Sequence, residues 1–168
     1  MFGLDRVLLV PCGDAPHKAA GEISAAVHRV ALCEIASANN DRLAVSRVEV
    51  GRPGPSYAYD TVSYFLETTP REELHFILGT DAFALIHTWY RYPELLDLCR
   101  YVVVRRPGYP EPAELPGVHH SGVAQLTVRG IEMSSTEIRE RVAEGRSIRY
   151  LVPPRVEAYV REHRLYRR

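Results

Sequence analysis

Short apolar segments that stop abruptly at glycine, proline or arginine alternate along this chain with segments of helical periodicity. Three such apolar segments cover residues 6–10, 74–78 and 101–104. Unbroken apolar runs of this length are typical of strands that are covered on both faces of a parallel sheet. Residues 24–38, in contrast, carry apolar side chains at helical spacing. The alternation predicts an α/β fold with a mainly parallel sheet and helices on both of its faces.

Weaker patterns complete the expected order of elements. Further strands are expected within residues 43–50 and at residues 124–128. Ser56 follows a loop rich in proline and glycine, and we expect it to cap a helix that runs to about residue 67. Shorter helices are expected at residues 81–86 and 93–98, and two or three more over the last forty residues. Because no linker or repeat interrupts this order, the sequence predicts a single domain over residues 1–168.

Charge and cysteine content exclude several classes of protein. Lys plus Arg and Asp plus Glu both number 21, whereas a nucleic-acid partner favours a clear basic excess. No apolar run approaches the length of a membrane span, and the amino end does not resemble a signal peptide. The three cysteines lack metal-binding or disulfide spacing, and so do the histidines. These observations predict a cytoplasmic protein that has no metal site of its own and binds neither nucleic acid nor membrane.

Polar, charged or glycine residues follow four of the expected strands. These strand ends cover residues 11–18, 79–81, 105–108 and 130–136. Ligands of open α/β sheets bind outside the carboxyl ends of the strands. Four such ends on one rim predict a polyanionic or sugar-bearing ligand.

The last of these strand ends carries the most specific pattern. Ser134 with Glu137 three residues later forms a capping box, and such a box need do no more than start a helix. In the functional interpretation, the backbone N–H groups of Ser135 and Thr136 hold a phosphate with the help of the helix dipole. Arg139 lies three residues after Thr136, so its guanidinium projects from the same face and can grip phosphate oxygens. The residues alone leave both interpretations open.

Four other residues are candidates for contact with a ligand, and three of them also have a purely structural interpretation. Gly79 allows a ligand to approach the backbone, and Asp81 can accept hydrogen bonds from ribose hydroxyls or merely cap a helix. Trp89 offers a stacking platform for a flat heterocycle, or it packs half-buried among its aromatic neighbours. Lys18 contacts a phosphate, or it is a solvated surface residue.

Taken in order, these segments resemble the bacterial nicotinate-nucleotide adenylyltransferases. The matching stretches cover residues 10–18, 54–61, 76–81, 88–90, 104–109, 134–139, 151–159 and 165–166. The Ser-Ser-Thr-x-Ile-Arg stretch at 134–139 is shared with the wider nucleotidyltransferase superfamily. The Ser-Tyr-x-x-Asp-Thr stretch at 56–61 and the Thr-Trp-Tyr stretch at 88–90 point to this family in particular. The resemblance implies a Rossmann-like, doubly wound sheet and transfer of the AMP part of ATP to nicotinate mononucleotide, in NAD biosynthesis.

The chain departs from the family pattern in two places. Residue 58 is usually threonine in the family and is Ala58 here, so a hydroxyl is lost while the backbone N–H remains. The family also opens with a strand and a Gly-Gly-Thr-Phe-Asp-Pro-x-His-x-Gly-His segment, and this sequence has no counterpart to either. A misassigned start codon, a fragment or a decayed paralogue would each account for this. Since that strand is central in the doubly wound order, we expect an opened or distorted sheet, or a partner chain, as in a homo-oligomer, that pairs with the exposed edges.

The resemblance also implies roles for individual residues. ATP would contact Gly79, Asp81, Arg106, Ser134, Ser135, Thr136 and Arg139. Nicotinate mononucleotide would contact Tyr57, Ala58, Tyr59, Asp60 and Trp89. Lys18 and Arg139 would serve catalysis by gripping phosphates, and Mg²⁺ would arrive with ATP rather than in a protein cage.

Three alternatives to full activity of this kind stay open at the level of sequence. Because the histidines of the family's opening segment are missing, we expect this chain to be weakly active or inactive. A sister adenylyltransferase that acts on nicotinamide mononucleotide or a pantetheine phosphate is a second alternative. A catalytically silent nucleotide-binding protein is the third.

Overall fold

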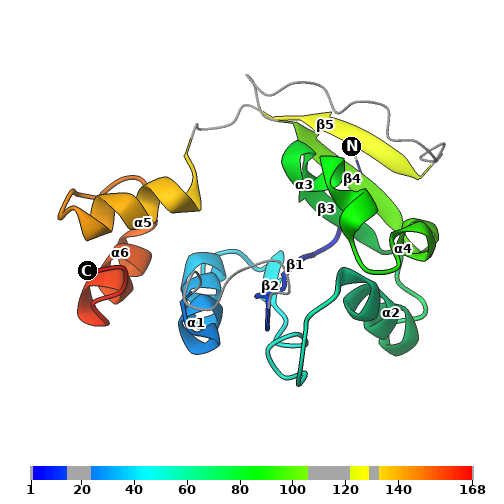
Figure 1. Ribbon diagram of the computed structural model, residues 1–168, viewed down its shortest axis with the longest axis horizontal. Helices are drawn as coiled ribbons and strands as arrows, with labels where there is room; N and C mark the ends of the chain where they lie inside the picture. The colour runs from blue at the N-terminus through cyan, green and yellow to red at the C-terminus, as the bar shows by residue number, and fades with distance from the viewer. Residues whose placement is uncertain (1, 15–23, 106–121, 129–132, 168) are drawn as a thin grey trace. The chain divides into compact units, whose positions relative to one another are not determined.

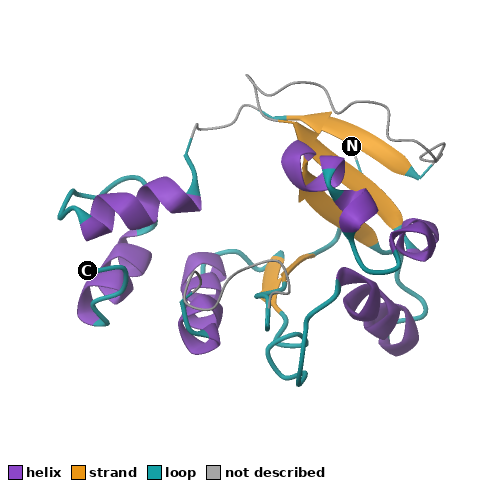
Figure 2. Cartoon of the chain, in the orientation of Figure 1, coloured by secondary structure: helices purple, strands orange, loops and turns teal. Residues whose placement is uncertain are grey.

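The computed structural model describes residues 2–14, 24–105, 122–128 and 133–167. Its contacts divide the chain into two compact units, which are described separately below. Unit 1 comprises Met1–Ser56 together with Glu132–Arg168, and unit 2 comprises Tyr57–Ile131. Helices and parallel strands alternate along both units (Figure 2). This alternation and the parallel pairing confirm the predicted α/β class.

Unit 1 is built on a short pair of parallel strands. Strand β1 (Val7–Leu9) pairs with β2 (Leu43–Val45), and helix α1 (Ala26–Ser37) connects them. Helices α5 (Ser135–Ala143) and α6 (Pro154–Glu162) complete the unit, and α6 packs against α1. A hydrogen bond of 3.0 Å between His28 Nδ1 and the Tyr159 hydroxyl joins α1 to α6.

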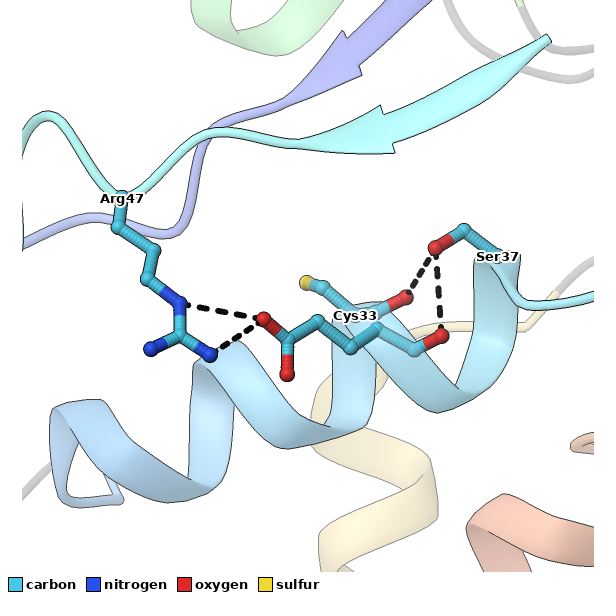
Figure 3. Close-up of polar contacts among 4 residues, drawn as sticks. Cys33, Ser37 and Arg47 are labelled. Carbon is cyan, nitrogen blue, oxygen red and sulfur yellow. Dashed lines mark hydrogen bonds and ion pairs between the residues drawn. The ribbon is translucent and has the colours of Figure 1, made fainter. Parts of the chain in front are cut away.

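The two ends of α1 are tied to neighbouring segments by polar side chains. Near its start, the Arg29 guanidinium donates to the carbonyl oxygens of Cys12, Gly13 and Ser24, and so fixes the segment that leaves β1. Near its end, Glu34 forms an ion pair with Arg47, which follows β2, and a distance of 2.6 Å separates Glu34 Oε1 from Arg47 Nη2 (Figure 3). Both contacts hold α1 against the strand pair that it connects.

The described part of unit 2 contains a three-stranded parallel sheet and four short helices. The strand order is β3 (His75–Gly79), β4 (Arg100–Arg105), β5 (Val123–Thr127), with β4 in the middle (Figure 1). The helices are α2 (Ala58–Thr68), α3 (Thr80–Ala84), the 3₁₀ helix η1 (Ile86–Thr88) and α4 (Tyr92–Leu98). The register places Phe76 beside Tyr101 and Tyr101 beside Val123.

One hydrophobic core holds unit 2 together. Ile86 and Leu95 are fully buried, and Tyr101 and Val103 of β4 are 1% exposed. The Tyr101 hydroxyl lies in this core and donates to the Leu95 carbonyl at 2.6 Å, which satisfies a polar group that would otherwise be costly to bury. The core therefore fixes α4, η1 and the sheet relative to one another, and with them the residues at the end of β3.

Three expectations can be compared with this fold. The described strands form two separate sheets rather than one, in agreement with the expected opened sheet. Residues 48–51 form a turn, so only the first part of the segment 43–50 is a strand. The predicted cap at Ser56 is wrong: Tyr57 is the N-cap of α2, and the Ser56 hydroxyl is buried without a hydrogen-bond partner in the part of the chain that the structure describes. The single domain over residues 1–168 stays a prediction.

Ser56 is buried because the loop before it packs closely on the segment after β1. The Ser56 N–H donates to the Asp14 carbonyl at 2.8 Å, and a β-carbon added at Gly13 would lie 2.6 Å from the Ser56 hydroxyl. The Ser56 hydroxyl is thus buried against the segment that follows β1. Among the described helices, none is long and apolar enough to cross a membrane.

Candidate functional site

The start of α5 is a helix end whose cap is formed as predicted. Ser134 is extended (φ −111°, ψ 154°), and its hydroxyl oxygen accepts a hydrogen bond of 3.0 Å from the Glu137 N–H. The Glu137 carboxylate forms an ion pair of 2.9 Å with Arg141, one turn further on. Only the Ser134 half of the expected capping box therefore forms as such, and Glu137 stabilises the helix through an i,i+4 pair instead.

Arg139 lies at the same end of α5. Its guanidinium donates to the Thr136 hydroxyl at 3.0 Å, so it folds back toward the first turn, as the spacing predicted. The helix start thus combines the backbone N–H groups that every helix leaves unpaired with a cation and a hydroxyl. Such a combination is suited to bind the oxygens of a phosphate.

In unit 2, the end of β3 brings a carboxylate over a glycine. Gly79 precedes α3, and a β-carbon added to it would lie 2.5 Å from Asp81 Oδ1. The side chain of Asp81 therefore folds back over the backbone at the carboxyl end of the strand, while remaining exposed. A carboxylate in this place can accept hydrogen bonds from the hydroxyls of a sugar.

A second candidate helix start, that of α2, lies in unit 2. Its N-cap, Tyr57, makes no side-chain capping bond among the described residues, and the first intrahelical bond runs from Thr61 N to Tyr57 O. The preceding N–H groups, at Ala58 and Tyr59, are the ones that a helix start leaves without an intrahelical partner. Asp60 lies in the same turn, where a negative side chain is stabilised by the helix dipole.

Aromatic residues surround this helix start. Trp89 is half-buried and packs edge-on against Phe76 of β3, with ring centroids 6.1 Å apart. The next residue, Tyr90, is 48% exposed and stacks on Tyr57 with centroids 4.5 Å apart. The Tyr90 ring also meets the edge of Tyr59 at 6.3 Å. Trp89 therefore packs against Phe76 on one side, as the structural interpretation predicted, and the neighbouring Tyr90 ring is more exposed.

Arg91 and Tyr90 were not among the residues selected from the sequence. The Arg91 guanidinium lies 4.1 Å from the centroid of the Tyr59 ring and forms an ion pair of 3.2 Å with Glu94. Arginine is protonated at every physiological pH, and the hydrogen bond to Glu94 raises the pKa of Arg91 further. Tyr90 belongs to the Thr-Trp-Tyr stretch and Arg91 follows it directly, but their contacts with Tyr57 and Tyr59 have no signal in the sequence because those residues lie more than thirty positions away.

Not every candidate residue can be placed. Lys18 and Arg106 lie outside the described residues. The candidates at the start of α5 belong to unit 1, and those at Tyr57 to Asp60, Gly79, Asp81 and Trp89 belong to unit 2. Within unit 2, the ring contacts bring the start of α2 to the segment that follows η1.

Among the described residues, neither a metal-binding cluster nor an activated thiol at Cys33 or Cys99 is found. No group of three or more histidine, cysteine or acidic side chains is arranged to hold a metal ion within the described ranges. Burial raises the pKa of the Cys99 thiol, and also that of Cys33, so both are held in the unreactive protonated form.

Similarity to known proteins covers nearly the whole chain. The family described as cytidylyltransferase-like matches residues 1–141. A probable nicotinate-nucleotide adenylyltransferase of Thermus thermophilus is 44% identical over 165 residues, which are 98% of this chain and 84% of that protein. One from Synechococcus sp. (strain JA-3-3Ab) is 38% identical over 172 residues, which are 98% of this chain and 82% of the relative.

Solved structures of low sequence identity share the fold. The nicotinic acid mononucleotide adenylyltransferase of Plasmodium falciparum, solved in complex with NaAD, aligns with a TM-score of 0.80 at 17% identity. The alignment covers 96% of this chain and 82% of that one. A second structure of the Plasmodium protein, in complex with APC, aligns with a TM-score of 0.77.

Proposed function

The chain belongs to the nicotinate-nucleotide adenylyltransferases within the cytidylyltransferase-like family, and from that premise we propose that it transfers the AMP part of ATP to nicotinate mononucleotide. The products are nicotinate adenine dinucleotide and pyrophosphate. The observation that carries this proposal is identity of 38–44% with such relatives over at least 98% of the chain. The capped start of α5, with Arg139 folded back onto Thr136, is the described geometry that supports it best.

The reaction is an in-line displacement at the α-phosphorus of ATP. A phosphate oxygen of nicotinate mononucleotide forms the new P–O bond, while the bond from the α-phosphorus to the bridging oxygen breaks and pyrophosphate leaves. The attacking oxygen is already anionic at neutral pH, so no side chain has to remove a proton from it. Catalysis then depends on positioning the two anions and neutralising their charge.

We assign the phosphates of ATP to the start of α5. There the N–H groups of Ser135 and Thr136 donate to phosphate oxygens, Ser134 holds the helix start in shape, and Arg139 adds a bidentate cation. Mg²⁺ bound with ATP would supply charge neutralisation on the leaving pyrophosphate. Lys18 is proposed as a further phosphate contact.

The two nucleosides are assigned to unit 2. Gly79 and Asp81 receive the adenosine of ATP, with the carboxylate accepting from ribose hydroxyls, and Arg106 is proposed to complete this bracket. Trp89 stacks on the nicotinate ring, and the N–H groups of Ala58 and Tyr59 bind its carboxylate. The last members of the nicotinate site are Tyr57, the helix N-cap, and Asp60, which orders the turn.

The acceptor decides between this function and its rivals. Release of pyrophosphate from ATP is measured with nicotinate mononucleotide, nicotinamide mononucleotide and a pantetheine phosphate as acceptors at equal concentration. We expect the highest kcat/KM with nicotinate mononucleotide. Preference for either other acceptor would assign the chain to a sister adenylyltransferase. If the protein binds ATP but releases no pyrophosphate from it in the presence of any of the three acceptors, the result would instead support a silent nucleotide-binding protein.

A further inference from the structure

Arg91 is held in an unusual place by three separate features of unit 2. It is the N-cap of α4 and adopts a left-handed backbone conformation (φ 52°, ψ 41°), which is uncommon for a residue that carries a β-carbon. Its guanidinium lies 4.1 Å from the centroid of the Tyr59 ring. Glu94, three residues later, accepts from Arg91 Nε at 3.2 Å. A cation–π contact and an ion pair thus fix the direction of this side chain.

The position over Tyr59 matters because Tyr59 lies in the first turn of α2. That turn carries the positive end of the helix dipole and has no side-chain cap among the described residues. Tyr90 stacks on Tyr57 at the same helix start. The charged groups that the described contacts of unit 2 place there include Asp60 on α2, and Arg91 with its partner Glu94 on the segment that enters α4.

Nicotinate and nicotinamide differ little in shape, and chiefly in charge. A backbone N–H group can donate to a carboxylate oxygen or to a carboxamide oxygen, so hydrogen bonding from α2 alone discriminates weakly between them. A fixed cation near the same position favours the ionised group through Coulomb attraction, which extends over about 10 Å at 0.1 M salt. Glu94 works in the opposite direction, because its negative charge offsets that of Arg91.

We propose that Arg91 is a specificity-determining residue, whose charge, held over Tyr59, favours the ionised carboxylate of nicotinate mononucleotide over the uncharged carboxamide of nicotinamide mononucleotide. This inference rests on the proposed function, since it assumes that the start of α2 binds the pyridine substituent. It adds a residue of this chain that acts on substrate choice through its charge rather than through direct contact.

The test compares dissociation constants for the two mononucleotides, measured by calorimetry at about 10 mM and about 100 mM ionic strength, where screening lengths are about 30 Å and 10 Å. Trp89 is the only tryptophan in the chain, so its fluorescence reports binding in parallel. We expect Arg91→Gln to lower the preference for nicotinate mononucleotide about two- to fivefold at low salt, and less at high salt. Glu94→Gln should raise the preference, and Arg91→Lys should retain most of it.

Arg100→Gln is the matched control, because Arg100 is an exposed arginine of the same unit that pairs with Glu73 at 2.8 Å. It should leave the preference unchanged. The proposal is overturned if Arg91→Gln leaves the ratio of the two dissociation constants unaltered, or weakens both ligands equally, while the unaltered protein still prefers nicotinate mononucleotide. If the unaltered protein shows no such preference, the proposed function fails together with this inference.

Discussion

Substitution of Ser134 separates the two interpretations of the α5 start, a structural cap and a phosphate site. Ser134→Ala removes the hydroxyl that accepts from the Glu137 N–H at 3.0 Å. Ser134→Asp keeps an acceptor there, since Asp caps helices as well as Ser does, and it adds a negative charge. If the segment is only a cap, Asp is harmless; if it also binds phosphate, Asp repels the ligand.

The expected sizes of the effects follow from the geometry. Loss of the cap in Ser134→Ala costs about 1 kcal/mol, and α5 has no buried residue to compensate for it, so local opening becomes about fivefold more frequent. In Ser134→Asp, the dipole stabilises the new charge and the helix is retained. A phosphate about 4 Å from that charge is repelled by about 1 kcal/mol in a water-like medium and about 4 kcal/mol at an effective dielectric constant of 20. Binding of ATP should therefore weaken about fivefold or more.

Two measurements on each variant are needed. Hydrogen exchange of the peptide that contains α5 reports local stability, and calorimetric titration with Mg-ATP reports affinity. Ser147 provides the control, because it is exposed in the same unit and its hydroxyl accepts from the Arg149 N–H at 3.1 Å. Ser147→Asp should leave ATP affinity unchanged.

The reasoning predicts that helix stability and ATP affinity separate in Ser134→Asp, with protected amides and weak binding. If Ser134→Asp binds ATP as well as the unaltered protein does, the start of α5 is a cap and the assignment of the phosphates there is refuted. Parallel loss of protection and affinity in both variants would show that only folding of the helix had been perturbed.

Three further predictions concern unit 2. Gly79→Ala pushes the Asp81 carboxylate from its place 2.5 Å from the new β-carbon, so we expect weaker ATP binding with unchanged thermal stability. Tyr101→Phe leaves the buried Leu95 carbonyl unpaired and should lower the free energy of unfolding by about 1–3 kcal/mol, seen as a lower urea midpoint at constant slope. Burial raises the pKa of the Cys99 thiol, so alkylation by iodoacetamide at pH 8 should be slow in the folded protein and fast in urea. Because the neutral thiol is favoured on folding, the stability that it contributes is present below the unfolded pKa of about 8.5 and is lost as pH rises above it.

Features that depend on local sequence were predictable. Strands β3 and β4 lie where apolar runs end at Gly79 and Arg105. The centre of β4 is buried, as expected of a strand that is covered on both faces, whereas Ile77 of β3 is 42% exposed. The Ser134 cap and the Arg139 side chain that folds back to Thr136 were equally predictable, because both follow from the spacing of residues along one helix turn.

Features that depend on contacts between distant segments were not predictable. Serine is a residue type that commonly caps helices, but the backbone after β1 packs against Ser56, and its hydroxyl is buried. The Tyr57–Tyr90 stack and the Arg91 contact with Tyr59 join segments more than thirty residues apart. Periodicity and spacing carry no information about such pairs. The left-handed backbone conformation at Arg91 could not be predicted either, because glycine, the residue that usually adopts it, is absent from this position.

The central claim is adenylyl transfer to nicotinate mononucleotide. It is tested most directly with ATP that carries a radioactive label at its α-phosphate, by identifying the product that receives the label. The identity of the labelled product decides the outcome, whatever its rate of formation. The account predicts that the label appears in nicotinate adenine dinucleotide, in equal amount to the pyrophosphate released, when nicotinate mononucleotide is the acceptor. Label that is released as free AMP, or that appears in any product other than nicotinate adenine dinucleotide, would contradict it.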